Sequence, residues 1–360
     1  MAHLFEPLAL RGIVVPNRIG IPPMCQYSAV DGLAQDWHFV HYGSRAVGGA
    51  GLLIVEATAV VPEGRISPGD LGLWEDRQIE PLARIVRFVR SQGTVPVLQL
   101  AHAGRKASVA LGWQPQRTLS ADEGGWPTVA PSALPFTEGY ATPQALDLDG
   151  IRGVVEHFAA AARRAKAAGF QGVEVHAAHG YLVHQFLSPL TNRRTDAYGG
   201  SFENRTRLAR EVVGAVRAEW PQELPVLIRL SATDWVEGGW TPEETVALCR
   251  ELKGLGVDLV DVSSAGLVPQ AKFPVGPGFQ TELAARVKRE AGIPTAAVGL
   301  ITSPAQADHV IRTGQADLVL LGRELLRDPS WPLEAAQALG QPTPWPRQYL
   351  RAAPPGSPAR

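Results

Sequence analysis

PVLIRLSATDWVEGGWTPEETVALCRELKGLGVDLVDVSS, residues 225–264, begins and ends with short runs rich in Val, Leu and Ile. Between these runs lies a segment of helical period, which begins with Thr-Pro-Glu at 241–243 and ends in Gly, as helix start and stop signals should. Apolar runs that are each followed by an amphipathic helix indicate parallel strands covered on both faces. The stretch therefore predicts a strand-helix-strand unit of a parallel sheet.

The same alternation recurs along the chain. The apolar runs are IGIPPM, GLLIVEA, VPVLQLAH, GVEVHAA, PVLIRLSA, DLVDVSS, PTAAVGL and LVLLG. Segments of helical period lie between them at 79–93, 151–169, 202–220, 241–256 and 303–314. Eight strands are the number that closes a (β/α)8, or TIM, barrel, and one α/β domain of this kind over residues 1–340 is of ordinary length for that fold.

Two segments depart from the repeat. Residues 103–150 follow the third run, are rich in Gly, Pro and Trp, and show no sustained period. We expect them to form a long loop that covers the carboxyl end of the barrel. Residues 341–360 are rich in Pro and end in PPGSPAR, which predicts a tail that is partly disordered or docks on a neighbouring subunit.

The composition excludes several classes of protein. The 360 residues are 45% hydrophobic and 19% charged with a formal net charge of -1, so a large core is available but no basic surplus for nucleic acid. No apolar run approaches the roughly 20 residues of a membrane helix, and the start lacks a secretory pattern, so we expect a cytoplasmic protein. Cys25 and Cys249 are too few for a disulfide scaffold or an iron-sulfur cluster.

Polar residues interrupt or end the apolar runs at selected places. In a barrel, chemistry is built where the strands end at the carboxyl face, so these residues are the candidates for a site. They are Cys25, Tyr27, Glu56, Gln99, His102, His176, His179, Arg229, Gly322 and Arg323.

Arg229 is the strongest of these signals, because a permanent charge flanked by Leu, Ile and Leu must meet an anion or a polarised oxygen. One interpretation is a buried ion pair with Glu56 or another acidic strand residue. The other is that the guanidinium faces an electron-rich group bound in the barrel mouth. Gln99 is either a satisfied core amide or a donor and acceptor for the edge of a heterocycle.

The last two strands end in Gly299 and Gly322, and the latter leads directly into a helix with Arg323. Glycine permits close backbone approach and a helix N-terminus attracts anions, so this end of the barrel predicts a phosphate site, although Gly also ends strands for steric reasons. No G-x-G-x-x-G joins a strand to a helix, so a nicotinamide cofactor would bind only transiently. No lysine lies within a strand run, which disfavours a Schiff-base aldolase.

His176 and His179 leave one strand end together, with Tyr181 two residues further on. Metal ligation is disfavoured, because H-x-H and H-E-x-x-H spacings are missing, and we predict no metal site. The pair can instead be core histidines, or donors to a carbonyl, phenolate or carboxamide oxygen. Tyr181 then offers a proton as a general acid.

At this point the chain resembles a known family. LFEPLALRGIVVPNRIGIPPMCQYSA at the start, QLAHAGRKA at 99–107, GVEVHAAHGYLVHQFLSPLTNRRTDAYGGSFENRTR in the middle, IRLSATDWVEGGW at 228–240 and GRELLRDP near the end carry the resemblance. These stretches are similar to the Old Yellow Enzyme flavoproteins, and within them to the bacterial NADPH dehydrogenase (ene-reductase) subclass. The resemblance implies a (β/α)8 barrel with FMN bound non-covalently at its mouth.

The resemblance also implies a role for each candidate. Pro22, Pro23, Met24, Cys25 and Ala57 would line the flavin. Gln99 would meet its pyrimidine edge and Arg229 its N1 and O2 side, where a positive charge favours the reduced form. Gly322 and Arg323 would bind the phosphate, with Gly299 nearby.

The family reaction is ping-pong: NADPH gives hydride to the flavin, and an activated alkene such as an enone then accepts it. His176 and His179 would bind the substrate carbonyl or a phenolic ligand, Tyr27 would add a hydrogen bond, and Tyr181 would protonate the α-carbon. NADPH over NADH is an expectation from the family alone. Two competing hypotheses are a metal-dependent barrel hydrolase and a flavin- or phenol-binding module without turnover.

Two positions separate the subclass from other members. Cys25 stands where the yeast and plant enzymes usually have threonine, so it either tunes the redox potential and substrate fit or is a small buried hydrophobe. Arg351 stands where the subclass has an arginine that enters the neighbouring subunit's site, which implies a homodimer or homotetramer. The residues after Arg351 depart from the short tail of the relatives.

Overall fold

Eight parallel strands form a closed barrel in the computed structural model, which describes residues 3–360. The strands are β3 (Ile19–Ile21), β4 (Leu52–Ala59), β5 (Val95–Ala101), β8 (Gly172–Ala177), β9 (Val226–Ser231), β10 (Leu259–Ser263), β11 (Thr295–Val298) and β12 (Leu318–Leu320). They neighbour one another in chain order, and β12 pairs with β3 to close the ring. Each predicted apolar run contains one of them, so the (β/α)8 prediction is confirmed.

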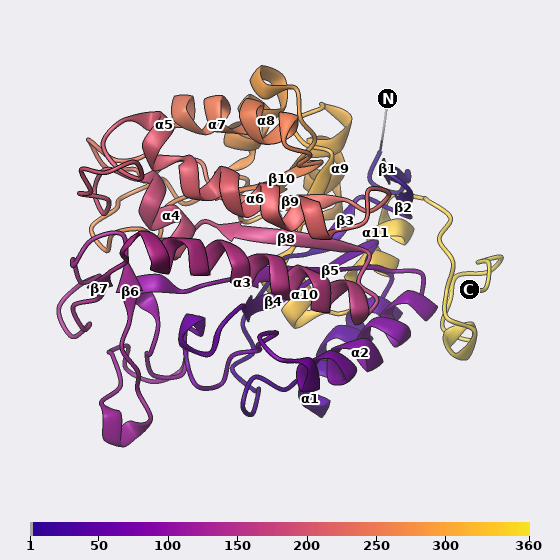
Figure 1. The fold of residues 1–360 in the computed structure, drawn as a ribbon. Helices are drawn as coiled ribbons and strands as arrows, with labels where there is room; N and C mark the ends of the chain where they lie inside the picture. The colour runs from indigo at the N-terminus through magenta and orange to yellow at the C-terminus, as the bar shows by residue number, and fades with distance from the viewer. Residues whose placement is uncertain (1–2) are drawn as a thin grey trace.

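Helices surround the barrel (Figure 1). They are α1 (Asp36–Val47), α2 (Ile79–Ser91), α3 (Leu148–Ala167), α6 (Arg207–Glu219), α7 (Pro242–Gly254), α8 (Thr281–Ala291), α9 (Pro304–Arg312), α10 (Gly322–Arg327) and α11 (Trp331–Ala338). The predicted helix 202–220 is interrupted, because α5 (Phe202–Arg205) ends at Thr206, whose hydroxyl donates back to the Phe202 carbonyl at 2.8 Å. The sequence patterns had not indicated α1 or α8.

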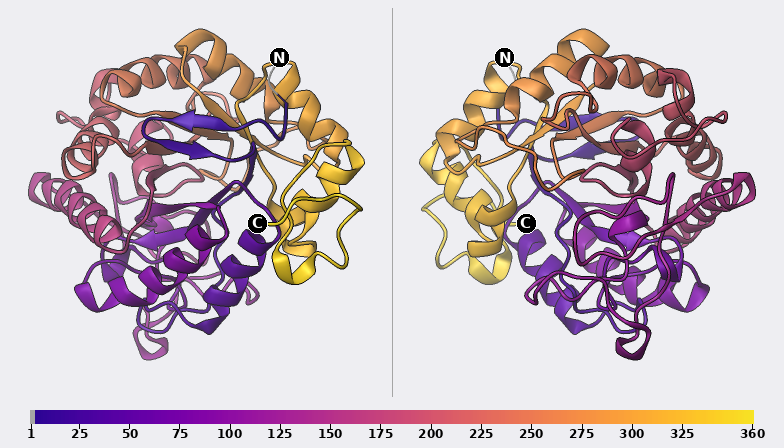
Figure 2. Two further views of the ribbon diagram at one scale, coloured as in Figure 1. Left: turned by 90° about the vertical axis from the view of Figure 1, so that its right-hand side faces the viewer. Right: turned by 90° about the vertical axis from the view of Figure 1, so that its left-hand side faces the viewer.

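The inside of the barrel has an apolar lower layer. Alternate residues of the strands point inward, and those near the strand starts form one buried cluster with a β-hairpin made of β1 (Leu8–Leu10) and β2 (Ile13–Val15). Figure 2 shows this hairpin across the amino end of the barrel. The hairpin therefore closes the barrel from below, so in the described chain a ligand would enter from the carboxyl end.

The upper layer of the interior is polar. Further along the same inward-facing rows stand Gln99 on β5, Glu174 and His176 on β8, Arg229 on β9 and Asp261 on β10. The register places Gln99 opposite Glu174, His176 opposite Arg229, and Arg229 opposite Asp261. Strand alternation thus gathers these side chains in the upper part of the barrel interior, at and just below the mouth.

Residues 103–147 form the long connection that the sequence predicted after the third strand. It is irregular apart from the 3-10 turns η3 (Gly104–Lys106) and η4 (Ala121–Glu123) and the short paired strands β6 (Val129–Ala130) and β7 (Gln144–Ala145). Trp126 Nε1 donates to the Glu63 carbonyl at 2.9 Å, and Arg194 Nη1 donates to the Pro131 carbonyl at 3.0 Å. Neighbouring loops on the carboxyl face therefore hold it in place.

The tail from 341 packs against the other end of the molecule. The Arg360 guanidinium donates to the carbonyls of Ala46 and Gln92, at 3.1 and 3.0 Å, where α1 and α2 end. The helices run opposite to the strands, so these helix ends lie at the amino end of the barrel, away from the mouth (Figure 2). Within residues 3–360, no helix is long and apolar enough to cross a membrane.

Candidate active site

Seven strands bring candidate residues to one end of the barrel. The residues at these strand ends are Pro22, Pro23, Met24 and Cys25 after β3, Ala57 in β4, Gln99 in β5, His176 in β8, Arg229 in β9, Gly299 after β11 and Gly322 after β12. The structure therefore places these sequence-predicted residues around a common mouth.

Arg229 makes a buried ion pair in the polar layer. Its Nε lies 2.8 Å from Oδ2 of Asp261, and the two side chains are 8% and 0% exposed. Neither Nη nitrogen donates a hydrogen bond to any residue in the part of the chain that the structure describes. The partner is Asp261, so the suggested pairing with Glu56 is wrong, while the more general prediction of an acidic strand residue is confirmed. The free Nη groups leave room for a second, electron-rich partner.

Gln99 is oriented by a buried carboxyl group. Its Nε2 donates to Glu174 Oε1 at 2.8 Å, while Glu174 Oε2 has no partner among the described residues. Burial raises the pKa of Glu174, and the nearby charge of Arg229 opposes that shift. The fixed amide leaves Gln99 Oε1 available as an acceptor toward the mouth.

Glu174 and Asp261 are the site residues that the motif analysis missed. Both lie in predicted strands. Glu174 stands opposite Gln99 and Asp261 opposite Arg229 on the neighbouring strands, so each points into the barrel as its neighbour does. Strand alternation was the signal that could have placed them inside the barrel.

His176 and His179 lie side by side at the carboxyl end of β8. Their ring centroids lie 5.5 Å apart with the planes at 81°, and His176 Nδ1 is buried without a partner in residues 3–360. His179 Nε2 lies 2.7 Å from Ser263 Oγ. Burial, then the Arg229 charge, lowers the pKa of both imidazoles well below the ordinary value, so each is neutral and carries one N–H.

Tyr181 lies beside this pair, with its ring centroid 4.9 Å from that of His176. Burial raises its pKa, so the phenol keeps its proton at neutral pH. Cys25 packs with Tyr181 against a small apolar cluster, and burial likewise raises the pKa of its thiol. Cys25 is therefore a protonated thiol rather than a nucleophile.

Tyr27 stands at the rim of the mouth. It follows Cys25 with a left-handed backbone conformation (φ 51°), and its ring meets the Trp113 ring edge-on at 5.8 Å. Trp113 belongs to the long connection after β5 and is 67% exposed. The connection thus reaches the rim of the site, as the sequence predicted.

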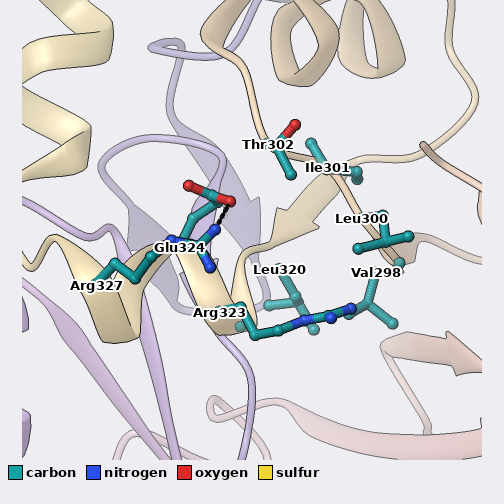
Figure 3. A pocket seen from close by; sticks show the side chains of 10 residues that line it. Val298, Leu300, Ile301, Thr302, Leu320, Arg323, Glu324 and Arg327 are labelled. Atoms are coloured by element: carbon teal, nitrogen blue, oxygen red, sulfur yellow. Dashed lines mark hydrogen bonds and ion pairs between the residues drawn. The ribbon is translucent and has the colours of Figure 1, made fainter. Parts of the chain in front are cut away.

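Gly299, Gly322 and Arg323 line one cavity of about 210 Å³ at the ends of β11 and β12. In Figure 3 the Arg323 side chain extends across the cavity toward Val298, while Arg327 is paired with Glu324. Arg323 is exposed and has no carboxylate partner in the described chain. An anion in this cavity would meet a free guanidinium and the start of α10.

Two of the polar residues that the sequence offered as site candidates, His102 and Glu56, make hydrogen bonds that support the fold. His102 Nδ1 accepts from the Gly104 N–H at 3.0 Å, and burial lowers its pKa to about 3. Glu56 Oε2 accepts from the Gln26 N–H at 2.7 Å and so anchors the segment that follows β3. Within residues 3–360, no three His, Cys, Asp or Glu side chains are grouped as metal ligands.

Arg351 does not join this site within its own chain. It is exposed in the tail, which is anchored at the amino end of the barrel. Any contact of Arg351 with a barrel mouth would be with that of another subunit.

Residues 3–341 match the model of the NADH:flavin oxidoreductase / NADH oxidase family. The chain belongs to this family. It is 49% identical over 350 residues to the NADPH dehydrogenase of Geobacillus thermodenitrificans (strain NG80-2), covering 97% of this chain and 98% of the relative. It is 47% identical over 354 residues to the NADPH dehydrogenase of Listeria monocytogenes serotype 4a (strain HCC23), covering 98% and 99% of the two chains. The resemblance to the bacterial NADPH dehydrogenases of the Old Yellow Enzyme family is confirmed.

Solved structures agree. Morphinone reductase superposes with a TM-score of 0.78 at 32% identity over 94% of this chain and 90% of its own. The old yellow enzyme homologue from Zymomonas mobilis gives 0.78 at 28% identity over 98% and 94%. A 2-naphthoyl-CoA reductase gives 0.84 at 26% identity over 94% of this chain and only 52% of its own.

The family member is thus an FMN-dependent oxidoreductase with NAD(P)H as the hydride donor. The residues present fit FMN: among the described residues, Arg229 has free Nη donors, Gln99 has an oriented amide, and an unpaired Arg323 lines a cavity at the ends of β11 and β12. Gly322 lies close to the segment after β3, since a Cβ there would stand 3.5 Å from Met24 Sδ.

A first prediction concerns the ion pair. Arg229→Met should lower the free energy of unfolding of the FMN-free protein by roughly 3–5 kcal/mol, because it leaves Asp261 buried without a counter-charge. Denaturant unfolding measures this loss. The double variant Arg229→Met/Asp261→Asn is the control and should recover most of it; a double variant as unstable as the single one would contradict the pairing.

Asp70 is a buried carboxyl group in the wall of the site whose pKa lies near neutrality. Asp70 is 1% exposed and lines a small cavity with Ala57 and Tyr181. It accepts from Ser67 Oγ at 2.7 Å and from the Ile66 N–H at 2.9 Å. Burial nevertheless raises its pKa to about 7.

This raised pKa predicts a pH dependence of stability. The folded protein binds the Asp70 proton more tightly than the unfolded chain, so the contribution is complete below about pH 4 and is lost as the pH rises through about 7. Between pH 5 and 8 the unfolding free energy of the wild type should fall by roughly 2–3 kcal/mol relative to Asp70→Asn. Urea unfolding measures it. The exposed Asp36→Asn is the control, and equal slopes for the wild type and Asp70→Asn would refute the assignment.

Proposed function

We propose that the protein is an NADPH:ene oxidoreductase that reduces activated C=C bonds of enones and related compounds in a ping-pong reaction with hydride transfer from flavin N5. The observation that carries this proposal is the meeting of two neutral imidazoles and a protonated phenol at the mouth, beside a buried guanidinium. FMN, when bound, supplies the hydride chemistry that links NADPH to the second substrate.

The proposed FMN contacts divide among the strand ends. Pro22, Pro23, Met24, Cys25 and Ala57 line the ring, and Gln99 binds its pyrimidine edge. Arg229 donates from its free Nη groups on the N1 and O2 side, which is the electron-rich partner that a buried guanidinium needs. Gly299, Gly322 and Arg323 hold the phosphate.

His176 and His179 bind the carbonyl oxygen of the substrate. A neutral imidazole has one N–H to give, and Nδ1 of His176 is a buried polar atom that lacks a hydrogen bond to any of residues 3–360. Two such donors draw electron density from the conjugated alkene, so its β-carbon becomes the hydride acceptor. A phenolate oxygen would occupy the same place.

Tyr181 protonates the α-carbon, and Tyr27 adds a hydrogen bond to the ligand. Tyr181 is suited to the acid role because its phenol stays protonated and lies against His176. Arg351 completes the site of a neighbouring subunit in a homodimer or homotetramer. A morphinone reductase has been solved in complex with tetrahydroNAD, which supports nicotinamide binding over the same barrel mouth.

The direct test uses the purified protein under anaerobic conditions. We expect a yellow protein that NADPH bleaches and 2-cyclohexenone recolours, because the two substrates use the site in turn. Absorbance in the visible range follows both steps. A colourless protein inactivated by chelator would favour a metal-dependent hydrolase, and a yellow protein that stays coloured under excess NADPH would favour a binding module without turnover.

The histidine pair has its own test. His176→Ala/His179→Ala should weaken binding of a phenol such as 4-hydroxybenzaldehyde to the oxidised protein by about 100-fold, because two buried donors are lost. Spectral titration measures the affinity. His157→Ala, on the exposed face of α3, is the matched control and should bind as the wild type does; unchanged affinity of the pair variant would refute its role.

A further inference from the structure

Lys106 is a partly buried cation beside the candidate active site that no step above uses. It ends the 3-10 turn η3, directly after β5, and its Nζ lies 4.7 Å from the centroid of the Phe136 ring and 5.0 Å from that of Tyr181. No carboxylate lies within ion-pair distance of it among the described residues, whereas Lys288 pairs with Asp317 at 2.9 Å. Removing an ammonium group from water is costly, and within the described chain no counter-ion offsets that cost for Lys106. Other interactions must therefore stabilise it.

Its hydrogen bonds go to backbone carbonyls of two turns. Lys106 Nζ donates to the His179 carbonyl at 2.9 Å and to the Gly266 carbonyl at 3.1 Å. Both acceptors have left-handed backbone conformations, with φ of 57° and 88°. The two turns touch, since a Cβ on Gly180 would stand 2.3 Å from the Gly266 oxygen. The ammonium therefore ties together the backbone that presents His179 and Tyr181.

Besides these two carbonyls, the ammonium group lies over the rings of Phe136 and Tyr181. A cation over a ring is attracted by its electron-rich face, and the attraction increases when the ring gains negative charge. Tyr181 gains such charge when its phenol gives up a proton. Burial lowers the pKa of Lys106 to about 8, so it is still mainly charged at neutral pH.

We infer that Lys106 is a positioning residue for proton donation by Tyr181: it holds the backbone that leads into Tyr181, and its charge favours loss of the phenolic proton. This role rests on the proposed ene-reduction. In that step the O–H bond of Tyr181 breaks, the proton forms a C–H bond at the α-carbon, and hydride supplied by NADPH through FMN forms the C–H bond at the β-carbon. The phenolate regains a proton from water before the next turnover.

The test separates the two half-reactions of the holoenzyme by stopped-flow absorbance. Lys106→Met should leave reduction by NADPH within about twofold of the wild type, because that step needs no proton from Tyr181. Oxidation by 2-cyclohexenone should slow by roughly tenfold or more. Lys106→Arg keeps the charge and the donors, so it should restore most of the rate. Lys106→Gln keeps a hydrogen-bond donor but removes the charge. If Lys106→Met does not retain FMN, Lys106→Gln takes its place in the test.

A double variant shows whether Lys106 acts through Tyr181. Lys106→Met/Tyr181→Phe should oxidise no more than about twofold slower than Tyr181→Phe alone, since the two residues serve one step. The control is Lys253→Met, because Lys253 Nζ also donates to a carbonyl, that of Gly292 at 2.6 Å, on the outer surface between α7 and α8. Both of its half-reactions should match the wild type.

Three results would overturn the inference. These are an unchanged oxidation rate in Lys106→Met, an equal loss in both half-reactions, or losses that multiply in the double variant. A wild-type protein that NADPH reduces but 2-cyclohexenone does not reoxidise would instead refute the proposed function, and this role of Lys106 with it.

Discussion

The arrangement of the site depends on one buried charge pair, Arg229 with Asp261, on neighbouring strands inside the barrel. Removing two charges from water costs several kcal/mol per ion, and only close pairing and further hydrogen bonds can offset that cost. The pair uses the Nε side of the guanidinium and leaves its Nη groups without a partner among residues 3–360. Below lies an apolar layer closed by the β1–β2 hairpin, so within residues 3–360 the remaining donors face the mouth. A ligand bound at the mouth would therefore meet a positive charge whose donors are still free.

The same charge sets the chemistry of the neighbouring imidazoles. Arg229 stands opposite His176 in the strand register, and its positive charge adds to burial in lowering the pKa of His176 and His179. A neutral imidazole donates through one nitrogen only, so the partner of the other nitrogen decides its direction. Ser263 occupies Nε2 of His179, whereas Nδ1 of His176 is unpartnered within the described chain. The two histidines therefore differ in which ring nitrogen is free. Strand β10 affects both, because Ser263 contacts His179 and Asp261 pairs with Arg229 beside His176.

Much of this could be predicted from sequence, because strand alternation and strand ends leave local signals. The runs around Gln99, His176 and Arg229 located the strands and the mouth, and the glycines at 299 and 322 located the cavity beside Arg323. The partner of Arg229 could not be chosen, since several acidic residues lie in apolar runs and only the register between β9 and β10 selects Asp261. Lys106 escaped notice for a different reason. Its acceptors are backbone carbonyls from two distant turns, and no local pattern records such contacts.

Glu56 shows why strand alternation alone does not predict which side chains point into the barrel. It follows the inward-facing Ile54 by two residues, yet the register of β4 against β5 shifts between Val55 and Thr58. Such a bulge redirects the side chains that follow it. Glu56 accepts from the Tyr42 hydroxyl on α1 at 2.9 Å and from the Gln26 N–H at 2.7 Å. It therefore joins a surrounding helix to the segment that lines the mouth after β3. One irregular strand in an otherwise regular barrel thereby lets a carboxylate hold the site wall from behind instead of adding a further negative charge beside Arg229.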